Sequence, residues 1–213
     1  MEKIFSDLHE QDYDILAVVL SSKLSGTLNS AEQARANLPD ATIEIVDSYT
    51  TVMALGFIVL HVAKAAEDGA SLADCKDLAE KARERTGILF AVDTLEFLHR
   101  GGRIGGGARF IGTALNLKPI LDVQDGAVEA VERVRTRKKS LNRLVELAEE
   151  RVGGRTPVRL ASLHANAPEE AKQILDEASD RLSADQTVFS EVSPAVGVHL
   201  GPGALGLAFM AGM

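Results

Sequence analysis

This chain of 213 residues has no tryptophan, a single cysteine and few long apolar runs. Cys75 is the single cysteine, which excludes an intramolecular disulfide and a zinc site made of cysteines. The longest apolar run, Val52 to Ala63, covers about a dozen residues, too few to span a bilayer. The first fourteen residues are acidic, whereas a signal peptide is basic and then apolar. These absences predict a cytoplasmic protein without a transmembrane segment.

Aromatic side chains and positive charge are also too few for nucleic-acid binding. Aromatic residues make up 4% of the chain, so an array of side chains that stack on bases is not expected. The formal net charge of -8 would repel a phosphate backbone. The five histidines show no spacing typical of a metal site, and we expect no metal ion. They are His9, His61, His99, His164 and His199.

The stretch ILAVVLSSKLSGTLNSAEQA contains the strongest indication of a binding site. An apolar run from Ile15 to Leu20 predicts a buried strand, and Leu28 to Asn37 predicts a helix. The hydroxyls and free backbone N–H groups between them could bind an anion, although Ser25 or Thr27 could equally be the N-cap of the helix. One helix needs one cap and this turn supplies four hydroxyls, which favours a ligand. The turn residues are Ser21, Ser22, Ser25, Gly26 and Thr27.

Strands and helices alternate through the rest of the first half. Strands are predicted at Thr42–Val46 and Ile88–Val92, and Val52–Glu67 is predicted to be a buried helix. Ser71 and Asp74 predict a capping box at the start of a charged helix. This order is typical of a parallel sheet with helices on its faces. Ligands bind at the carboxyl ends of strands in such sheets, and the SSKLSGT turn follows a strand in this way.

The second half contains a hairpin signal and a glycine-rich loop. QDG at Gln124–Gly126 predicts a turn between strands at Ile120–Val123 and Ala127–Val134. Five glycines from Gly101 to Gly107 follow a predicted helix and lack the ending of a P-loop. We therefore expect a hinge or close-packed loop there, rather than a phosphate site. A strand, an amphipathic helix and another strand are predicted at 155–164, 169–182 and 187–192.

Three glycines near the end, Gly201, Gly203 and Gly206, match GxGxxG, with a predicted strand before them and a predicted helix after them. The sequence ends at Met213, before the acidic residue that the dinucleotide fingerprint places about twenty residues later. No cofactor is therefore expected. The glycines are instead expected to let the backbone bend tightly beside His199.

Five cations crowd into seven residues of an otherwise acidic protein. Such a run is usually a solvated face. Cations at the start of the following helix oppose its dipole, however, and an acidic partner surface would explain the arrangement. The cations are Arg133, Arg135, Arg137, Lys138 and Lys139.

Several motifs, taken together, resemble the DegV family of fatty-acid-binding proteins, which includes the binding subunit of bacterial fatty acid kinase. They are SSKLSGTLNSA, a strand ending in VDS, FLHRGGRIG, NLKPIL before the DG turn, and VGVHLGPGALG. The resemblance implies an α/β fold of two domains: a parallel-sheet domain at 1–98, incomplete relative to the family, and an α/β domain with a β-hairpin at 99–213. It also implies a long-chain fatty acid bound between the domains, with no catalysis and no cofactor.

The same resemblance implies roles for individual residues. The fatty acid carboxylate is held by the Ser of the SGT turn, matched by Ser25 with Gly26 and Thr27, and by the His of the HxGPG segment, matched by His199. Two arginines match positions where the family's binding subunits meet a separate ATP-dependent kinase, which would phosphorylate the bound acid to an acyl phosphate. They are Arg103 in the GGR loop and Arg135 beyond the hairpin.

This sequence departs from the family at its start, where members usually have a further strand and a loop whose Thr also contacts the carboxylate. Either the start codon is assigned too late, or this is a shortened form with an exposed sheet edge, which favours pairing with another chain. Two other functions stay open. One is a hydrolase with Ser25 as nucleophile and His199 as base, although SSKLSGT is not the GxSxG elbow. The other is a regulatory or interaction module without a ligand.

Overall fold

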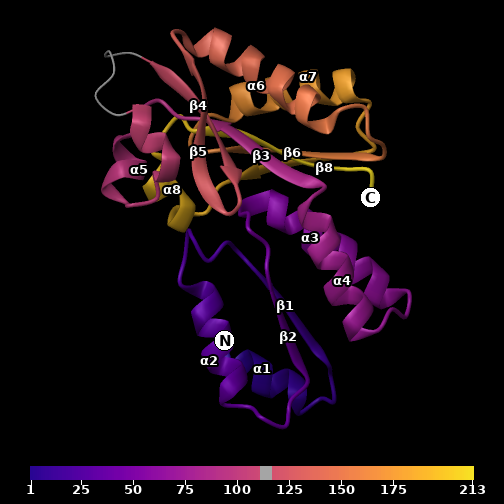
Figure 1. Ribbon diagram of the computed structural model, residues 1–213. Coiled ribbons are helices and arrows are strands. Elements are labelled where there is room, and N and C mark those ends of the chain that lie inside the picture. Colours follow the sequence, from indigo (N-terminus) through magenta and orange to yellow (C-terminus); the bar gives the residue numbers. More distant parts are fainter. Residues whose placement is uncertain (111–116) are drawn as a thin grey trace.

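The computed structural model describes residues 1–110 and 117–213, without the side chains of residues 107, 109 and 110 (Figure 1). Its strands form two sheets. The small sheet consists of two parallel strands, β1 (Ile15–Val19) and β2 (Ile43–Asp47). The large sheet has the order β5-β4-β3-β8-β6-β7. Its strands are β3 (Thr86–Ala91), β4 (Lys118–Gln124), β5 (Ala127–Val134), β6 (Val158–His164), β7 (Gln186–Glu191) and β8 (Leu205–Ala211).

Helices cover the faces of both sheets, which confirms the predicted α/β fold (Figure 1). Helices α1 (Glu2–His9) and α2 (Thr27–Ala36) pack on the small sheet, and α6 (Arg137–Val152) and α7 (Pro168–Leu182) pack on one face of the large sheet. The contacts of α3 (Val52–Glu67) and α4 (Leu72–Arg83) reach strands of both sheets. Two short helices, α5 (Glu96–Arg100) and α8 (Pro194–Leu200), contact each other.

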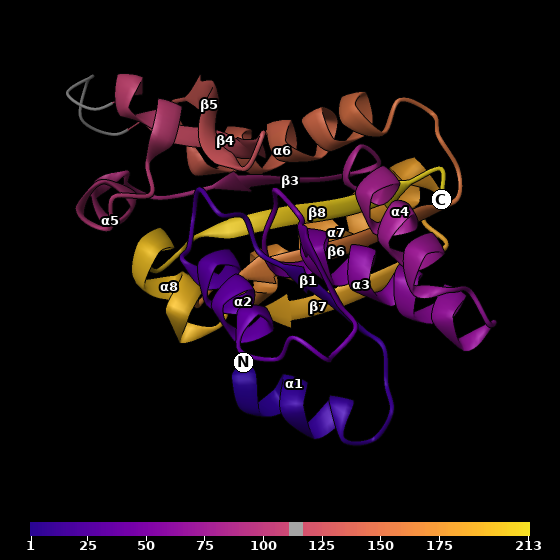
Figure 2. The ribbon, with the colours of Figure 1, turned by 60° about the horizontal axis from the view of Figure 1, so that its bottom comes forward.

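The third predicted strand does not belong to the parallel sheet. Ile88–Val92 corresponds to β3, which pairs antiparallel with β4 and with β8 in the large sheet. Figure 2 shows β3, β8, β6 and β7 side by side, in the order that the pairing requires. The expectation of one parallel sheet containing all three strands is therefore wrong. The last strand of the small sheet ends at residue 47, and the first strand of the large sheet begins at residue 86. The division into domains 1–98 and 99–213 stays a prediction.

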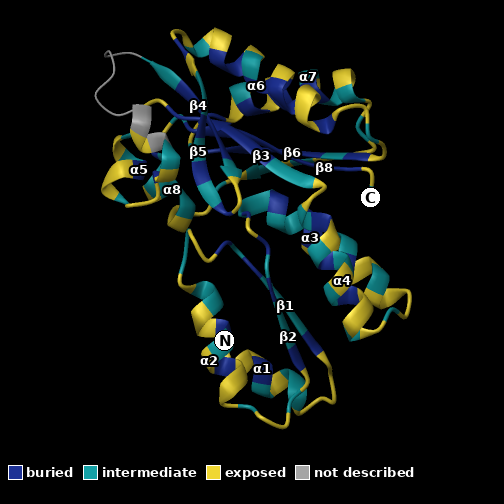
Figure 3. Ribbon diagram, in the orientation of Figure 1, coloured by how far each residue is buried: buried dark blue, intermediate teal, exposed yellow. Residues whose placement is uncertain are grey.

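The central strands of the large sheet form most of the core (Figure 3). Every residue of β8 is buried, because apolar residues from Leu205 to Ala211 face helices on both sides of the sheet. Leu160, Leu144 and Ile174 belong to the cluster between the sheet and helices α6 and α7. A separate cluster, which includes Phe5, joins α1 and α2 to the small sheet. Each sheet therefore has a hydrophobic core of its own.

Local signals in the sequence fix several element boundaries. Helix α3 spans the predicted residues, and Ser71 and Asp74 form the predicted capping box at α4. The hairpin between β4 and β5 turns at Asp125 and Gly126, whose φ angles of 47° and 83° suit the tight turn that QDG predicts. Helix α6 begins at Arg137, where the Thr136 hydroxyl accepts a hydrogen bond from the Lys139 N–H.

Helix α3 is less buried than its apolar sequence predicts. Val59 and Leu60 are 41% and 51% exposed, because no described element packs on that side of the helix. A groove of about 620 Å³ runs beside it, between α3, α4 and β1. Strand β1 pairs with β2 alone among the described strands.

Asp122 in β4 is a buried carboxylate whose ionisation should oppose folding. Its side chain is 5% exposed, and Oδ2 accepts hydrogen bonds from Gln124 (2.7 Å) and Arg151 (2.8 Å). Its Oδ1 has no hydrogen-bond partner among the described residues. Burial raises the pKa of Asp122, although the hydrogen bond from Gln124 and the charge of Arg151 oppose the increase.

A carboxyl group with a raised pKa binds its proton more tightly in the folded protein than in the unfolded chain. Its contribution to stability is therefore lost as the pH rises above the ordinary value of 3.8 and through the pKa of the folded state. We expect Asp122→Asn to gain stability relative to the wild type as the pH increases from 3 to 7, since a tenfold difference in proton affinity is worth about 1.4 kcal/mol. Urea unfolding across this range measures the difference. If the free energy of unfolding of Asp122→Asn, relative to that of the wild type, stays constant or falls as the pH rises, the assignment is wrong.

Candidate functional site

The SSKLSGT turn follows β1 and lies at the contact between the two sheets. Ser21 is fully buried, and its hydroxyl donates a hydrogen bond to the carbonyl of Gly126 in the hairpin of the large sheet, at 2.7 Å. Its N–H donates to the carbonyl of Thr50 in the turn after β2. A side chain at Gly126 would collide with the Ser21 hydroxyl, so a glycine is required there. Three segments distant in sequence therefore meet at this turn.

The N-cap of α2 is Gly26, without a hydrogen bond from a capping side chain. Neither Ser25 nor Thr27, the two residues that the alternative interpretation offered as caps, is therefore the N-cap residue. Instead, the hydroxyls of Ser25 and Thr27 hydrogen-bond to each other at 2.8 Å, and the Ser25 Oγ also accepts from the Thr27 N–H at 3.3 Å. The Ser25 hydroxyl is thus held by Thr27 and accepts from the first N–H of α2, although Ser25 is not the N-cap residue itself.

A cavity of about 330 Å³ lies between this turn, the large sheet and α8. Its volume is at the lower end of the range for small-molecule sites. Apolar side chains line most of it, from β3, β4, β5, β6, α5, α8 and the start of β8. Four polar side chains line the same cavity: Ser25, Thr51, Arg103 and His199. Such a lining suits a ligand with a long apolar part and one polar group.

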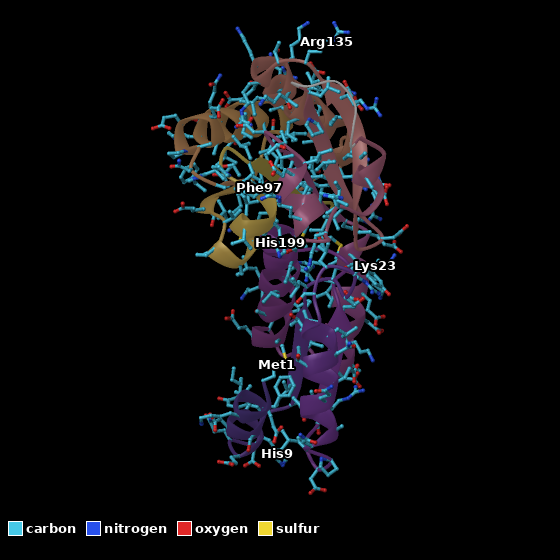
Figure 4. All side chains as sticks on the ribbon, turned by 90° about the vertical axis from the view of Figure 1, so that its left-hand side faces the viewer. Met1, His9, Lys23, Phe97, Arg135 and His199 are labelled. Atoms are coloured by element: carbon cyan, nitrogen blue, oxygen red, sulfur yellow. The ribbon has the colours of Figure 1, made fainter. Side chains whose placement is uncertain are left out.

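The structure brings together some of the predicted site residues but not all. Ser25 and His199 line the one cavity, although they are far apart in the sequence. Gly26 and Thr27 are not among its lining residues, and Thr27 reaches it only through the Ser25 hydroxyl. Figure 4 shows Lys23, from the same turn, at about the level of His199, between the two parts of the molecule. Two of the residues that the resemblance assigns to the head-group site, Ser25 and His199, therefore line the same cavity.

His199 lies on α8 and packs against the loop after α5. A Cβ placed on Gly101 would lie 2.1 Å from Nδ1 of His199, so the ring occupies the space that a side chain would need. Nδ1 is buried and has no hydrogen-bond partner among the described residues. No described carboxylate therefore orients this ring from Nδ1, as the acid of a Ser-His-acid triad does. The pairing of Ser25 with Thr27 likewise differs from a Ser-His hydrogen bond.

The three terminal glycines have a different setting from the one the sequence suggested. Gly201 follows α8 and Gly206 lies within β8, so the segment comes after a helix and before a strand, the reverse of the dinucleotide fingerprint. Gly201 and Gly203 have φ angles of 78° and 79°, which confirms the expected tight bend beside His199. Side chains there would meet Phe97 and Asp93.

Arg103 and Arg135 lie in different parts of the molecule. Arg103 lines the cavity, and its guanidinium donates to the carbonyls of Leu24 (3.1 Å) and Gly101 (2.6 Å). Arg135 is exposed after β5, at the far end of the molecule from His9, with His199 between them (Figure 4). In the run of cations, Arg137 is paired with Glu170 at 2.7 Å, so part of its charge is balanced within the protein.

Thr51 and Val52, at the start of α3, line the cavity although they are not among the site residues that the sequence predicts. Thr51 is indeed the N-cap of α3, but its side chain makes no capping hydrogen bond, and the residue lines the cavity. Val52 beside it has φ of 46°, an unfavourable conformation for a β-branched residue. Strain of this kind is often found at functional sites. No sequence signal distinguished Thr51 from the other hydroxyls of DSYTT.

Two other features are absent from the described residues. No described helix is long and apolar enough to cross a membrane. Nor does the described part of the chain contain a cluster of three or more His, Cys, Asp or Glu residues suited to a metal ion.

Comparison with known proteins identifies the family. The profile of the DegV family, described as uncharacterised proteins, matches residues 1–212. The chain belongs to the DegV family. A DegV domain-containing protein of Streptomyces coelicolor is 42% identical over 195 residues, which cover 91% of this chain and 68% of that protein. Protein DegV of Bacillus subtilis is 36% identical over 200 residues, which cover 92% of this chain and 71% of that protein.

Solved DegV structures agree with the fold. A DegV family protein from Thermus thermophilus, described by its fatty acid binding, superposes with a TM-score of 0.93 at 32% identity, over 99% of this chain and 75% of that one. The DegV fatty acid binding protein from Bacillus subtilis superposes with a TM-score of 0.84 at 33% identity, over 99% of this chain and 77% of that one. These structures confirm the predicted DegV-like α/β fold.

Proposed function

We propose that this protein binds one long-chain fatty acid in the cavity between the SSKLSGT turn, the large sheet and α8, and acts as a carrier without catalysis of its own. The observation that carries the proposal is the cavity itself, whose mostly apolar lining includes the polar residues Ser25, Thr51, Arg103 and His199. The fatty acid binding of the Thermus and Bacillus relatives supports it. We also propose that the protein is cytoplasmic and needs no cofactor.

The apolar tail would supply most of the binding free energy. Burying about fifteen methylene groups at ~0.8 kcal/mol each gives roughly 12 kcal/mol before the costs of association. The carboxylate needs hydrogen bonds and positive charge, because an unpaired charge is costly to remove from water. Ser25, Thr51 and His199 can supply hydrogen bonds, and Arg103 brings a cation to the same cavity.

We further propose that the bound acid is presented to a separate ATP-dependent kinase, which would form an acyl phosphate. The support is the motif resemblance at Arg103 and Arg135 together with the exposure of both side chains. Arg103 lines the cavity with His199, and Figure 4 shows Arg135 far from His199, so a partner that contacts both arginines would have to cover a broad surface.

Solvent extraction of the purified protein, followed by mass spectrometry, tests the carrier proposal. We expect about one long-chain fatty acid per chain and no turnover of fatty-acyl esters. A protein that is correctly folded by circular dichroism but carries no lipid, and takes up none when supplied, would refute fatty acid binding. Ester hydrolysis that disappears in Ser25→Ala would instead identify the protein as a hydrolase.

A further inference from the structure

We infer that Arg103 is a positioning residue, which clamps the Ser25 turn to the loop on which His199 rests; this inference rests on the proposed function. The guanidinium bonds to two backbone carbonyls that belong to different parts of the chain. Nε donates to Leu24, the residue before Ser25, at 3.1 Å. Nη1 donates to Gly101 at 2.6 Å. One side chain thus links the turn after β1 to the loop after α5.

Each end of this clamp is next to a proposed contact of the carboxylate. Leu24 and Ser25 are neighbours in the same turn and both line the cavity. Gly101 lies directly against the imidazole of His199. A shift of either carbonyl relative to the other would therefore change the separation of the Ser25 hydroxyl and the His199 ring.

The shape of arginine matters for this function. Its guanidinium is planar, and its N–H groups point in fixed directions, so two of them can hold two carbonyls at a fixed spacing. A lysine at the same position keeps the positive charge but has a single flexible ammonium group. The substitution Arg103→Lys therefore separates positioning from simple attraction between a cation and the carboxylate.

The experiment compares binding of a C16 fatty acid with that of the C16 primary alcohol, by displacement of a fluorescent fatty acid. If Arg103 positions the head-group site, Arg103→Ala and Arg103→Lys both weaken binding of the acid by roughly tenfold, about the loss of one hydrogen bond to the carboxylate from a displaced Ser25 or His199. Binding of the alcohol is unchanged. The matched control is Arg100→Ala, since Arg100 is exposed and paired with Glu96 on α5.

Two results would overturn the clamp. Wild-type affinity in Arg103→Lys would show that charge alone is sufficient, and equal losses for the acid and the alcohol would show a general structural effect. Amide hydrogen exchange of the ligand-free protein is an independent measure, for which we expect faster exchange at residues 21–27 in both Arg103 variants and not in Arg100→Ala. Unchanged exchange at these residues would overturn the clamp, whether or not the wild type binds a fatty acid. Absence of fatty acid binding by the wild type would separately refute the proposed function.

Discussion

Val196→Glu is expected to abolish fatty acid binding, whereas Val198→Glu on the same helix leaves it unchanged. Val196 lines the apolar part of the cavity from α8. A carboxylate there would either lie in apolar surroundings or draw water into the cavity, and burying such a charge costs several kcal/mol. Because 1.4 kcal/mol corresponds to a factor of ten, the affinity should fall by at least about 100-fold.

Val198 provides the matched control for this substitution. It is two residues further along α8, is 65% exposed, and is absent from the cavity lining. Both variants add one negative charge to the same short helix, so a general effect of charge on α8 would appear in both. The measurements are displacement of a fluorescent fatty acid and the yield of extracted lipid, with thermal melting to verify folding. Equal losses in the two variants would show that the tail does not occupy this cavity.

The sequence predicts the local structure well, because the relevant signals are short. The capping box of Ser71 and Asp74 and the QDG hairpin each depend on residues next to one another, and both are confirmed. The placement of β3 was wrong for a physical reason: an apolar run such as Ile88–Val92 suits any buried strand, and neither its sheet nor its direction is encoded within it.

In the site, too, residues within sequence motifs could be predicted, whereas contacts between distant segments could not. Family motifs in the sequence indicated Ser25 and His199, and the structure places both on one cavity. Thr51 carries no comparable signal, since a threonine at the start of a helix is first a candidate cap. The contact of Gly101 with His199 depends on how α8 packs against α5 and could not be predicted from either segment alone.

Gly101→Ala is expected to weaken fatty acid binding by roughly 10- to 100-fold, by displacing His199. The backbone at Gly101 has φ of -76°, which alanine adopts without strain. The added Cβ would, however, lie 2.1 Å from Nδ1 of His199, so the ring has to move. Loss of a hydrogen bond to a charged group costs about 1.5–3 kcal/mol, which corresponds to the expected decrease in affinity.

Gly102→Ala is the control for a mutation in the same loop. Gly102 has open space around its Cα, but its φ of 68° disfavours alanine by about 1 kcal/mol. This variant should therefore lose stability in urea unfolding and keep its affinity for the fatty acid, the opposite of the pattern at Gly101. The two variants together distinguish a disturbed loop from a displaced imidazole.

A double-mutant cycle then tests whether Gly101 acts through His199. If the only effect of Gly101→Ala is to move the ring, the double variant Gly101→Ala, His199→Ala should bind the acid as weakly as His199→Ala alone. Losses that add would mean that the alanine disturbs the site by another route, such as the Gly101 carbonyl that Arg103 binds. Non-additive losses would show that this loop needs glycine at 101 because the imidazole occupies the place of a side chain.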